Sequence, residues 1–488
     1  MPFYTGKAKC IYIDPPFNTG NAFDFYDDKL EHSQWLSLMY PRLVLLRELL
    51  AKEGSVFIHL NDDELDYCKV FMDEVFGRVN FVNRISIEAR SPSAFSTVNP
   101  GVFKSAEYIL WYAKDKNSFS ENSVRVQRNP DAAYDKWLVN PDDHYENWKF
   151  VSIMEPYSKL KPPRSEKLDS LLKHFYKFII ENARQVCRLA SISDSGAGEA
   201  IINLKTSSLN SLDKILRLER DGNLDDVYVV NGQQLLFYEK NIAVVDGIKC
   251  ATSILTNVWK DIAWEGIANE GSVTFKKGKK PERLVKRCFE LATNKNDIVI
   301  DCFLGSGTTA AVAHKMNRRY IGIEMGEHAK THCIPRLEKV IAGEQGGISK
   351  AVNWAGGGGF SFYTLGEAVF DADGHISQAV RFNALAAYIW LLETKTASSI
   401  KTETATTPYL GTHDGIAYYL LYNGILGDRR PNGGNVLTSS ILMHLNSVHT
   451  HKGKKVVFGE ASRLGAAKLA TENISFKQIP YELHENIG

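Results

Sequence analysis

The sequence lacks the features that mark secreted, metal-clustered or membrane-spanning proteins. Its 488 residues contain only 7 cysteines. They are scattered, odd in number and without a Cys-x-x-Cys pair, which argues against a disulfide framework and a zinc site. No apolar run approaches the roughly 18 residues that a membrane-spanning helix needs, and no signal peptide follows Met1. We therefore expect no bound metal and a reducing cytoplasm.

A strong excess of charge is also missing. Lysine and arginine number 58 against 57 acidic residues, a net charge of +1. This balance neither supports nor excludes a nucleic-acid partner, because a basic groove can be offset by acidic surface elsewhere. Apolar residues make up 44% and charged residues 24%, as in ordinary globular chains. At roughly 150 residues per domain, the length suggests two to four domains.

The first part of the chain alternates apolar strands with amphipathic helices. Lys9 to Ile13 is a short β-branched and aromatic run that Pro15 and Pro16 would end. The elements expected after it are a helix over 33–53 stopped by Gly54, a strand over 55–60, a helix over 63–76 and a strand over 106–113. This alternation predicts an α/β fold with a mostly parallel sheet.

The middle of the chain has a weaker pattern, and regular alternation returns after it. Residues 117–274 mix polar stretches with one long helical segment over 166–190, and we interpret them as an inserted domain. The elements expected next are a helix over 281–293, a strand over 297–300, a loop and helix over 305–317 and a strand over 320–323. The sequence thus predicts one domain built from 1–116 and 275–345, with the insertion over 117–274.

The tail, 346–488, has its own pattern. Gly356 to Gly359 and the Thr-rich stretch 394–408 predict loops. The pattern that follows is strand 417–422, helix 437–448, strand 455–459, helix 463–472 and strand 474–479. This βαβαβ order predicts a small C-terminal α/β domain.

A glycine-containing loop after a buried strand indicates a cofactor site. The segment 297–309 reads DIVIDCFLGSGTT, so the strand ends in Asp301 and the loop holds Gly305 and Gly307. Small residues allow a ligand close to the backbone, and the helix N-terminus offers N–H groups. Glu324 ends the next strand, where an acid can accept hydrogen bonds from ribose hydroxyls. The alternative is a tight turn in a purely structural unit. No Gly-Lys-Ser/Thr follows, so the loop is not a Walker A motif.

The run Asp14-Pro15-Pro16-Phe17 ends the first strand. Its position is the edge at which open α/β sheets bind ligands. Two prolines stiffen the loop and remove two N–H donors, while their carbonyls remain able to accept. An exocyclic amine needs two acceptors, which Asp14 and the Pro15 carbonyl can supply. The alternative is an ordinary strand-ending turn, because Asp-Pro is common in turns.

Taken together, these motifs resemble those of the β class of DNA amino-methyltransferases. The Phe-x-Gly-x-Gly element is Phe303 to Gly307, and the Asp-Pro-Pro-Phe element precedes it with a large insertion between them. The extension through Asn18, Thr19 and Gly20, and the long tail, are similar to the modification subunit of type III restriction–modification systems. The resemblance is strong over 9–76, 106–114 and 278–340 and weak over 120–260.

The resemblance implies a fold, an activity and a set of site residues. The fold is a Rossmann-like, doubly wound methyltransferase sheet with an inserted target recognition domain and a small C-terminal α/β domain. The activity is methyl transfer from S-adenosylmethionine to the N6 amine of adenine in duplex DNA, after the base is extruded. The implied catalytic residues are Asp14, Pro15, Pro16 and Phe17. The implied cofactor residues are Asp301, Phe303, Gly305, Ser306, Gly307, Thr308, Thr309, Glu324, Lys280, Pro281, Asn18 and Thr19.

Within this implied site, some roles stay open. Asp14 at the first motif position favours adenine by association within the family, although the N4 amine of cytosine fits the same acceptors. Lys280 either pairs with a carboxylate or belongs to a solvated run with Lys276, Lys277 and Lys279. Cytosine-C5 chemistry is excluded, because no Pro-Cys pair is present. His59 is interpreted as a core histidine, and Asn61-Asp62-Asp63 as a cap of the following helix.

The implied partners are double-stranded DNA, a second copy of the chain and a restriction (helicase-nuclease) subunit, in a prokaryotic cytoplasm. Two residue sets in or beside the insertion are either a DNA surface or ordinary core and surface residues. They are Trp137, Trp148, Trp259 and Trp264, and the basic residues Lys159, Lys161, Arg164 and Lys167.

The resemblance also contains one departure. The family has a further strand, ending in Gly-Asp, before the acceptor strand, whereas here Met1 stands only a few residues before Lys9. We expect the acceptor strand to have an unpaired edge, and hypothesise that the chain as written is weakly active or inactive. Two other functions stay open. One is a non-catalytic DNA-binding scaffold subunit; the other is an RNA or protein-amide methyltransferase, against which the motif order argues.

Overall fold

The computed structural model describes most of the chain. The described residues are 3–18, 31–90, 102–160, 167–222, 224–275, 278–366, 368–370, 376–377, 380–397, 407–422 and 435–480. They form two compact units. The first contains 1–121, 258–344 and 356–488, and the second contains 122–257 and 345–355. The units are described separately below.

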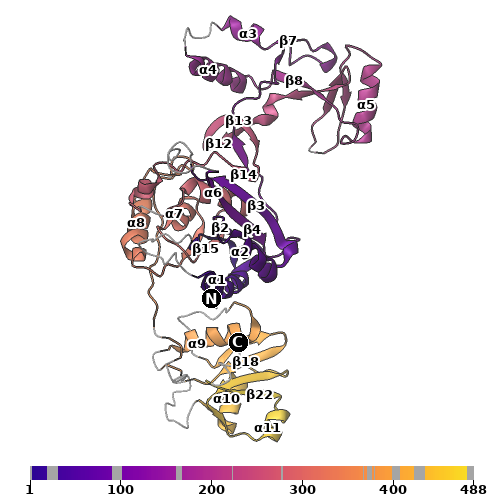
Figure 1. Cartoon of the computed structure of the whole chain (residues 1–488). Coiled ribbons are helices and arrows are strands. Elements are labelled where there is room, and N and C mark those ends of the chain that lie inside the picture. The colour runs from indigo at the N-terminus through magenta and orange to yellow at the C-terminus, as the bar shows by residue number, and fades with distance from the viewer. Residues whose placement is uncertain are drawn as a thin grey trace. The chain divides into compact units, whose positions relative to one another are not determined.

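A seven-stranded sheet is the centre of the first unit (Figure 1). Its strands, in spatial order, are β14 (Val258–Trp259), β3 (Phe81–Glu88), β4 (Ala106–Ala113), β2 (Leu50–Leu60), β1 (Ala8–Ile13), β15 (Ile298–Asp301) and β16 (Arg319–Gly322). Only β4 runs antiparallel to its two neighbours; the other neighbouring pairs are parallel. The expected mostly parallel α/β sheet is confirmed.

Helices cover both faces of this sheet, as a doubly wound fold requires. They are α1 (His32–Leu49), α2 (Leu65–Met72), α6 (Glu282–Ala292), α7 (Thr308–Lys315) and α8 (Ile334–Ile341). Side chains alternate between faces along a strand. Ile11 and Ile13 of β1 pack with Trp35 and Met39 of α1, while α6 also packs against β1 and β2. Because β1 is buried on both faces, it consists almost wholly of apolar and aromatic residues.

The expected unpaired edge at the acceptor strand is wrong. Strand β1 pairs with β2 on one side and with β15 on the other. Within the described residues, the edges of this sheet are β14 and β16. The expectation failed because β15, which ends in Asp301, occupies the position beside β1.

Two predicted helices in this unit have different bounds. The helix expected over 33–53 ends at Leu49, and residues 50–53 belong to β2, because Leu50 pairs with Ala8 across the sheet. Gly54 therefore lies inside a strand, where a β-carbon would be 2.7 Å from the Ala8 carbonyl oxygen. The helix expected over 63–76 is α2 followed by a π-helical turn, Asp73–Gly77.

The second unit is built mainly from antiparallel strands. One sheet contains β7 (Phe150–Ser152), β6 (Lys136–Leu138), β8 (Val186–Ser191), β11 (Gln233–Phe237), β10 (Val227–Val230) and β9 (Leu216–Leu218); the other contains β12 (Ile242–Val245), β13 (Ile248–Ile254) and β5 (Arg125–Gln127). Its helices are α3 (Met154–Lys159), α4 (Leu168–Glu181) and α5 (Glu199–Leu209). The helix expected over 166–190 ends at Glu181, because 187–191 pair with β11 and Val186 pairs with β6 instead.

The C-terminal part contains the expected βαβαβ order. Its elements are α9 (Phe382–Thr394), β17 (Tyr409–His413), β18 (Ile416–Leu420), β19 (Val436–Leu437), α10 (Ser439–Val448), β20 (Lys455–Gly459), β21 (Ala461–Ser462), α11 (Ala466–Thr471) and β22 (Ile474–Gln478). Strands β18, β20 and β22 are parallel neighbours, which confirms the predicted pattern. The strand β17 and the apolar helix α9 were not predicted from the sequence.

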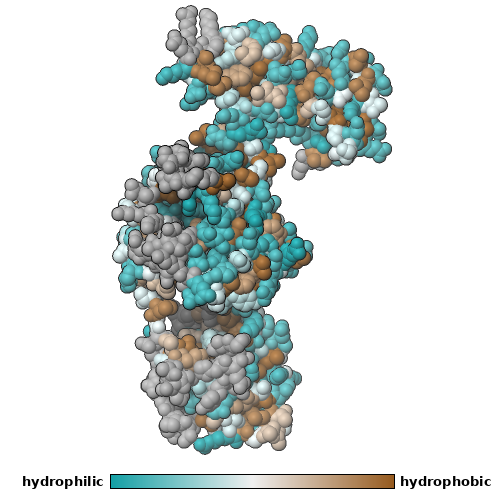
Figure 2. All heavy atoms as spheres, viewed as in Figure 1, coloured by the Kyte–Doolittle hydropathy of each residue, from teal (hydrophilic) through white to brown (hydrophobic). Residues whose placement is uncertain are grey.

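Two further observations concern the surface. Within the described residues, no helix combines the length and apolar character needed to cross a membrane. Hydrophobic and hydrophilic residues are interspersed over the face shown in Figure 2.

Candidate functional site

The two predicted motifs meet at the carboxyl ends of neighbouring strands in the central sheet. Ile11 of β1 is in register with Ile300 of β15, and the two strands are parallel. Asp14, just after β1, and Asp301, the last residue of β15, therefore lie at the same edge. The Asp14 charge is one of the causes that raise the pKa of Asp301. This edge is where ligands bind in open α/β sheets.

The two carboxylate oxygens of Asp14 have different surroundings. Its Oδ2 is 2.9 Å from Lys280 Nζ. Its Oδ1 is buried and has no hydrogen-bond partner among the described residues. Burial raises the pKa of Asp14, although the Lys280 charge opposes this shift. A buried acceptor without a partner is costly, so Oδ1 is suited to an incoming N–H donor.

The two prolines differ in how their carbonyls are used. Trp35 Nε1 donates to the Pro16 carbonyl oxygen at 2.7 Å. The Pro15 carbonyl accepts no hydrogen bond within the part of the chain that the structure describes. The sequence predicts the Pro15 carbonyl as the second acceptor for an exocyclic amine, and this carbonyl is thus able to accept a hydrogen bond.

Phe17 lies between a cation and an imidazole. Lys280 Nζ lies 4.4 Å from the centre of its ring, a cation–π contact, and the ring of His59 is 5.8 Å away. These contacts fix the aromatic ring beside Asp14.

A buried polar group lies beneath the acceptor motif. His59 is fully buried, with Nε2 2.9 Å from Glu107 Oε2 and Nδ1 3.0 Å from the Tyr12 hydroxyl. Polar groups lie close to both ring nitrogens, which agrees with the interpretation of His59 as a core histidine. Burial raises the pKa of Glu107, but Lys280 and His59 outweigh it and lower that pKa to about 2. Sequence reasoning missed Glu107; its signal was one acid within the apolar strand AEYILWYA.

The glycine loop begins at Asp301. The carboxylate of Asp301 accepts from the Phe303 backbone N–H at 2.9 Å and from the Thr309 side chain. Burial raises the pKa of Asp301 to about 7. Gly305 and Gly307 have φ of 54° and 78°, which glycine adopts most readily. A β-carbon on Gly307 would also lie 3.3 Å from Cys333 Cα.

Glu324 holds this loop in place. Its Oε2 accepts from the Gly305 N–H at 2.7 Å and its Oε1 from the Gly326 N–H at 2.9 Å. His328 Nε2 lies 3.0 Å from Oε1, and the Glu324 side chain is only 1% exposed. The sequence predicts that Glu324 accepts a hydrogen bond from a ribose hydroxyl. Its carboxylate already accepts from two backbone amides, so this contact would use its remaining lone pairs. The contact stays a prediction. Phe303 packs against the core.

Lys280 and Pro281 lie at the start of α6. Pro281 is the N-cap, directly before Glu282, and its carbonyl accepts from the Leu284 N–H at 3.1 Å. Lys280 is buried and forms the Asp14 ion pair, and Lys279 binds backbone carbonyls. Neither lysine is part of a solvated charge run. Lys276 and Lys277 lie outside the described residues.

In the extension after Phe17, the described residue is Asn18. Asn18 has φ of 58°, and its Nδ2 donates to Glu64 Oε1 at 2.8 Å. Thr19 and Gly20 lie outside the described residues. The predicted cap at Asn61-Asp62-Asp63 is wrong, because Glu64 occupies the N-cap of α2 and no side-chain cap bond forms.

The four tryptophans that the sequence left open as a DNA surface or core residues have packing contacts. Trp137 stacks on Phe178 with ring centres 5.3 Å apart. Trp148 donates to the Asp143 carbonyl, and Trp259 is buried in β14. Trp264 packs edge-on against His59, 6.3 Å between ring centres.

Two of the four basic residues considered for a DNA surface, Lys159 and Lys167, lie among the described residues. Lys159 lies 3.6 Å from Glu155, and Lys167 is the N-cap of α4. Lys161 and Arg164 lie outside the described residues.

The edge suits a cationic, nucleoside-containing ligand. Asp14 and Asp301 are buried carboxylates whose pKa values are both raised, so a positive charge placed between them would relieve the cost of ionising them. The loop from Gly305 to Gly307 precedes the N-terminus of α7, where small residues allow close approach to the backbone. These residues fit S-adenosylmethionine, whose sulfonium is positively charged. Within the described residues no cluster of potential metal ligands occurs.

The known proteins to which the chain is similar are DNA methylases and subunits of restriction-modification enzymes. Residues 8–334 match the family described as DNA methylase. The chain is 35% identical over 391 residues to the "Probable type III restriction-modification enzyme HindVI Mod subunit" of Haemophilus influenzae, covering 74% of this chain and 51% of that protein. It is 25% identical to the StyLTI Mod subunit of Salmonella typhimurium, covering 64% and 47%. It is 27% identical to the type II methyltransferase M.EcaI of Enterobacter cloacae, covering 65% and 62%.

The chain spans about half the length of the two Mod subunits. The family match, in contrast, runs from the first residue of β1 into α8, and so includes both motifs of the sheet edge. On this match, the chain belongs to the DNA methylase family.

Proposed function

We propose that the chain transfers a methyl group from S-adenosylmethionine to the N6 amine of adenine in duplex DNA. The observation that carries this proposal is the buried Oδ1 of Asp14, which has no partner among the described residues although Oδ2 is held by Lys280. An exocyclic amine offers the N–H donor that this oxygen needs.

The acceptor residues act on the amine directly. Asp14 Oδ1 and the Pro15 carbonyl accept its two N–H groups, which makes the nitrogen more pyramidal and more nucleophilic. Lys280 favours the ionised form of Asp14. The nitrogen loses a proton as it gains the methyl group, and Asp14 Oδ1, the carboxylate oxygen among the two acceptors, takes that proton. Phe17 stacks on the extruded base, a contact worth roughly 1–3 kcal/mol.

The donor side is the glycine loop. S-adenosylmethionine supplies an electrophilic methyl group when bound. The residues that would hold it are Asp301, the backbone of Gly305 to Gly307, Thr308 and Glu324. Holding both substrates in line supplies much of the rate, because it replaces a bimolecular encounter with a fixed geometry.

Adenine rather than cytosine rests on likeness. Asp14-Pro15-Pro16-Phe17 matches the adenine form of the motif, and two relatives are named Mod subunits of type III restriction-modification enzymes. The N4 amine of cytosine satisfies the same two acceptors, so the base has to be identified by experiment.

The remaining regions have supporting roles in this proposal. The second unit, 122–257 with 345–355, would read the DNA sequence. The C-terminal α/β domain would hold a second copy of the chain or a restriction subunit, in a prokaryotic cytoplasm. Both assignments follow what the motif resemblance implies.

The test uses methyl-labelled S-adenosylmethionine and genomic DNA from a strain without DNA methylases. After digestion, label in N6-methyladenine supports the proposal, and label in N4-methylcytosine replaces the base assignment. Specific DNA retention without any transfer would establish the non-catalytic scaffold instead. Asp14→Ala is the matched inactive control.

A further inference from the structure

Behind the glycine loop lies a cluster of buried charges that the proposed chemistry does not use. Resting on the proposed function, we propose that Arg336, held by Glu282, is a positioning residue that fixes the glycine loop for the methyl donor. Through Glu282, the same contacts tie this loop to the segment that carries Lys280 and hence to the acceptor Asp14.

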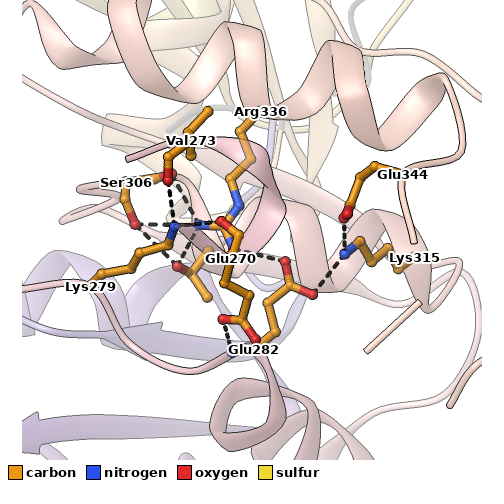
Figure 3. Close-up of polar contacts among 9 residues, drawn as sticks. Glu270, Val273, Lys279, Glu282, Ser306, Lys315, Arg336 and Glu344 are labelled. Atoms are coloured by element: carbon orange, nitrogen blue, oxygen red, sulfur yellow. Dashed lines mark hydrogen bonds and ion pairs between the residues drawn. The ribbon is translucent and has the colours of Figure 1, made fainter. Parts of the chain in front are cut away.

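Arg336 contacts the loop at three atoms. Its Nη1 donates to Thr308 Oγ1 at 2.7 Å, to the Ser306 carbonyl at 3.2 Å and to Ser306 Oγ at 3.4 Å. Figure 3 shows the guanidinium between the loop and Glu282. Ser306 and Thr308 flank Gly307, the N-cap of α7. Arg336 therefore fixes the turn on which a nucleoside ligand would rest.

Glu282 holds Arg336 from the other side. Its Oε1 accepts from Arg336 Nη2 at 2.8 Å, and its Oε2 is 2.7 Å from Lys315 Nζ. Lys315 also pairs with Glu344. Glu282, Lys315 and Arg336 have no exposed side-chain surface. The pKa of Glu282 is lowered because Arg336 and Lys315 outweigh the effect of burial.

One short segment joins these contacts to the acceptor. In four consecutive residues, Lys279 donates to the Val273 carbonyl at 2.8 Å and to that of Glu270, Lys280 pairs with Asp14, and Glu282 binds Arg336. The Glu282 backbone N–H donates to Glu270 Oε2 at 2.9 Å. The glycine loop and the acceptor carboxylate of Asp14 are thus both held by residues at the start of α6.

A role in packing alone does not explain this choice of residues. A buried ion pair is often no more stable than apolar side chains of the same volume, because both charges lose their hydration. An arginine instead offers five donors in a fixed planar fork, which defines the position of its acceptors. Here the fork contacts two loop residues and one anchoring carboxylate, so it determines loop geometry.

The test measures cofactor binding apart from catalysis. Binding of S-adenosylhomocysteine and of DNA is titrated by calorimetry for the wild type, Arg336→Lys and Glu282→Gln, with the melting temperature recorded for each. We expect both variants to raise the Kd for S-adenosylhomocysteine at least tenfold while the Kd for DNA stays within twofold. Steady-state assays should show a raised KM for cofactor with a smaller change in kcat.

The matched control is Glu393→Gln, which breaks a partly buried ion pair with Lys477 in the C-terminal part. It should lower the melting temperature without changing cofactor affinity.

Three outcomes would overturn the proposal. If Arg336→Lys and Glu282→Gln melt earlier but bind S-adenosylhomocysteine like the wild type, the cluster only stabilises the fold. If Glu393→Gln weakens cofactor binding equally, the effect is general destabilisation. If the wild type itself binds no S-adenosylhomocysteine, the proposed function fails, and this inference fails with it. Should Arg336→Lys not fold, Glu282→Gln decides alone, since it keeps one acceptor oxygen for Arg336 while it removes the charge and replaces the second oxygen with an amide NH2.

Discussion

Asp14 and Asp301 end neighbouring parallel strands and lie at the same edge of one sheet, yet they are held in opposite ways. Asp14 is bound by Lys280, which lies far away in the sequence and just before α6, and it keeps one oxygen without a partner among the described residues. Asp301 is bound by the Phe303 amide and Thr309 of its own loop. The first arrangement leaves an acceptor for a substrate, and the second shapes a turn.

Burial raises the pKa of both carboxyls, and different groups oppose that shift. At Asp14 the main opposing group is the charge of Lys280. At Asp301 the opposing groups are the Thr309 side chain and the Phe303 amide, and the pKa rises to about 7. The comparison predicts that Asp14 serves catalysis and that Asp301 serves cofactor affinity.

The largest effect is expected at Asp14. Asp14→Asn removes the charge that Lys280 pairs with and weakens the acceptor for the amine. Loss of one preorganised hydrogen-bond group in a transition state costs about 10²–10³-fold in rate. Single-turnover methylation should slow by that factor while cofactor affinity changes little. Cofactor affinity falling in parallel with the rate would show that the two carboxylates do not divide the work.

Asp301 should show the reverse pattern. Asp301→Asn weakens the charge-assisted hydrogen bonds that shape the loop, each worth about 1.5–3 kcal/mol. We expect the Kd for S-adenosylhomocysteine to rise roughly 10- to 100-fold, with a smaller change in the single-turnover rate at saturating cofactor. Unchanged affinity would remove Asp301 from the cofactor site.

The same variant should be more stable than the wild type at neutral and higher pH. The pKa of Asp301 is about 7 when folded, against the ordinary 3.8. Between these values the folded state binds more protons, so the free energy of unfolding falls as pH rises through this window. At 1.36 kcal/mol per unit the limit is about 4 kcal/mol. We expect roughly half, because asparagine forms weaker bonds to Phe303 and Thr309.

The measurement is urea unfolding without cofactor at pH 5 and pH 8. The stability of Asp301→Asn relative to wild type should increase from the lower to the higher pH. A difference that does not vary with pH would mean that Asp301 is ionised normally.

A smaller effect is expected at Trp35. Trp35→Phe removes the donor to the Pro16 carbonyl, a bond worth about 1 kcal/mol, and should slow methylation a few-fold by loosening the acceptor loop. Trp111→Phe is the control, because the Trp111 Nε1 is buried without a partner among the described residues. Equal loss in both variants would argue against a specific role for the Trp35 bond.

The sequence was informative where the relevant contacts are local. Asp14, Asp301 and the glycines of the loop belong to short motifs, and α6 was predicted to within a residue at each end because its apolar spacing is regular. Residues 50–53 and 186–190 were predicted as helix but are strand, since pairing with distant strands overrides local preference. Glu107, Glu282 and Arg336 were missed. The hydrogen-bond and ion-pair partners of their side chains lie 28 or more residues away, so no spacing rule reveals them.

The position of β1 inside the sheet has a consequence for amide hydrogen exchange. Cys10 to Ile13 are paired with β2, and the neighbouring strand β15 covers the other edge. Such backbone amides exchange with solvent only when the whole sheet opens. Deuterium uptake at this strand therefore reports the global unfolding of the domain, and the acceptor carboxylate stays anchored until that event.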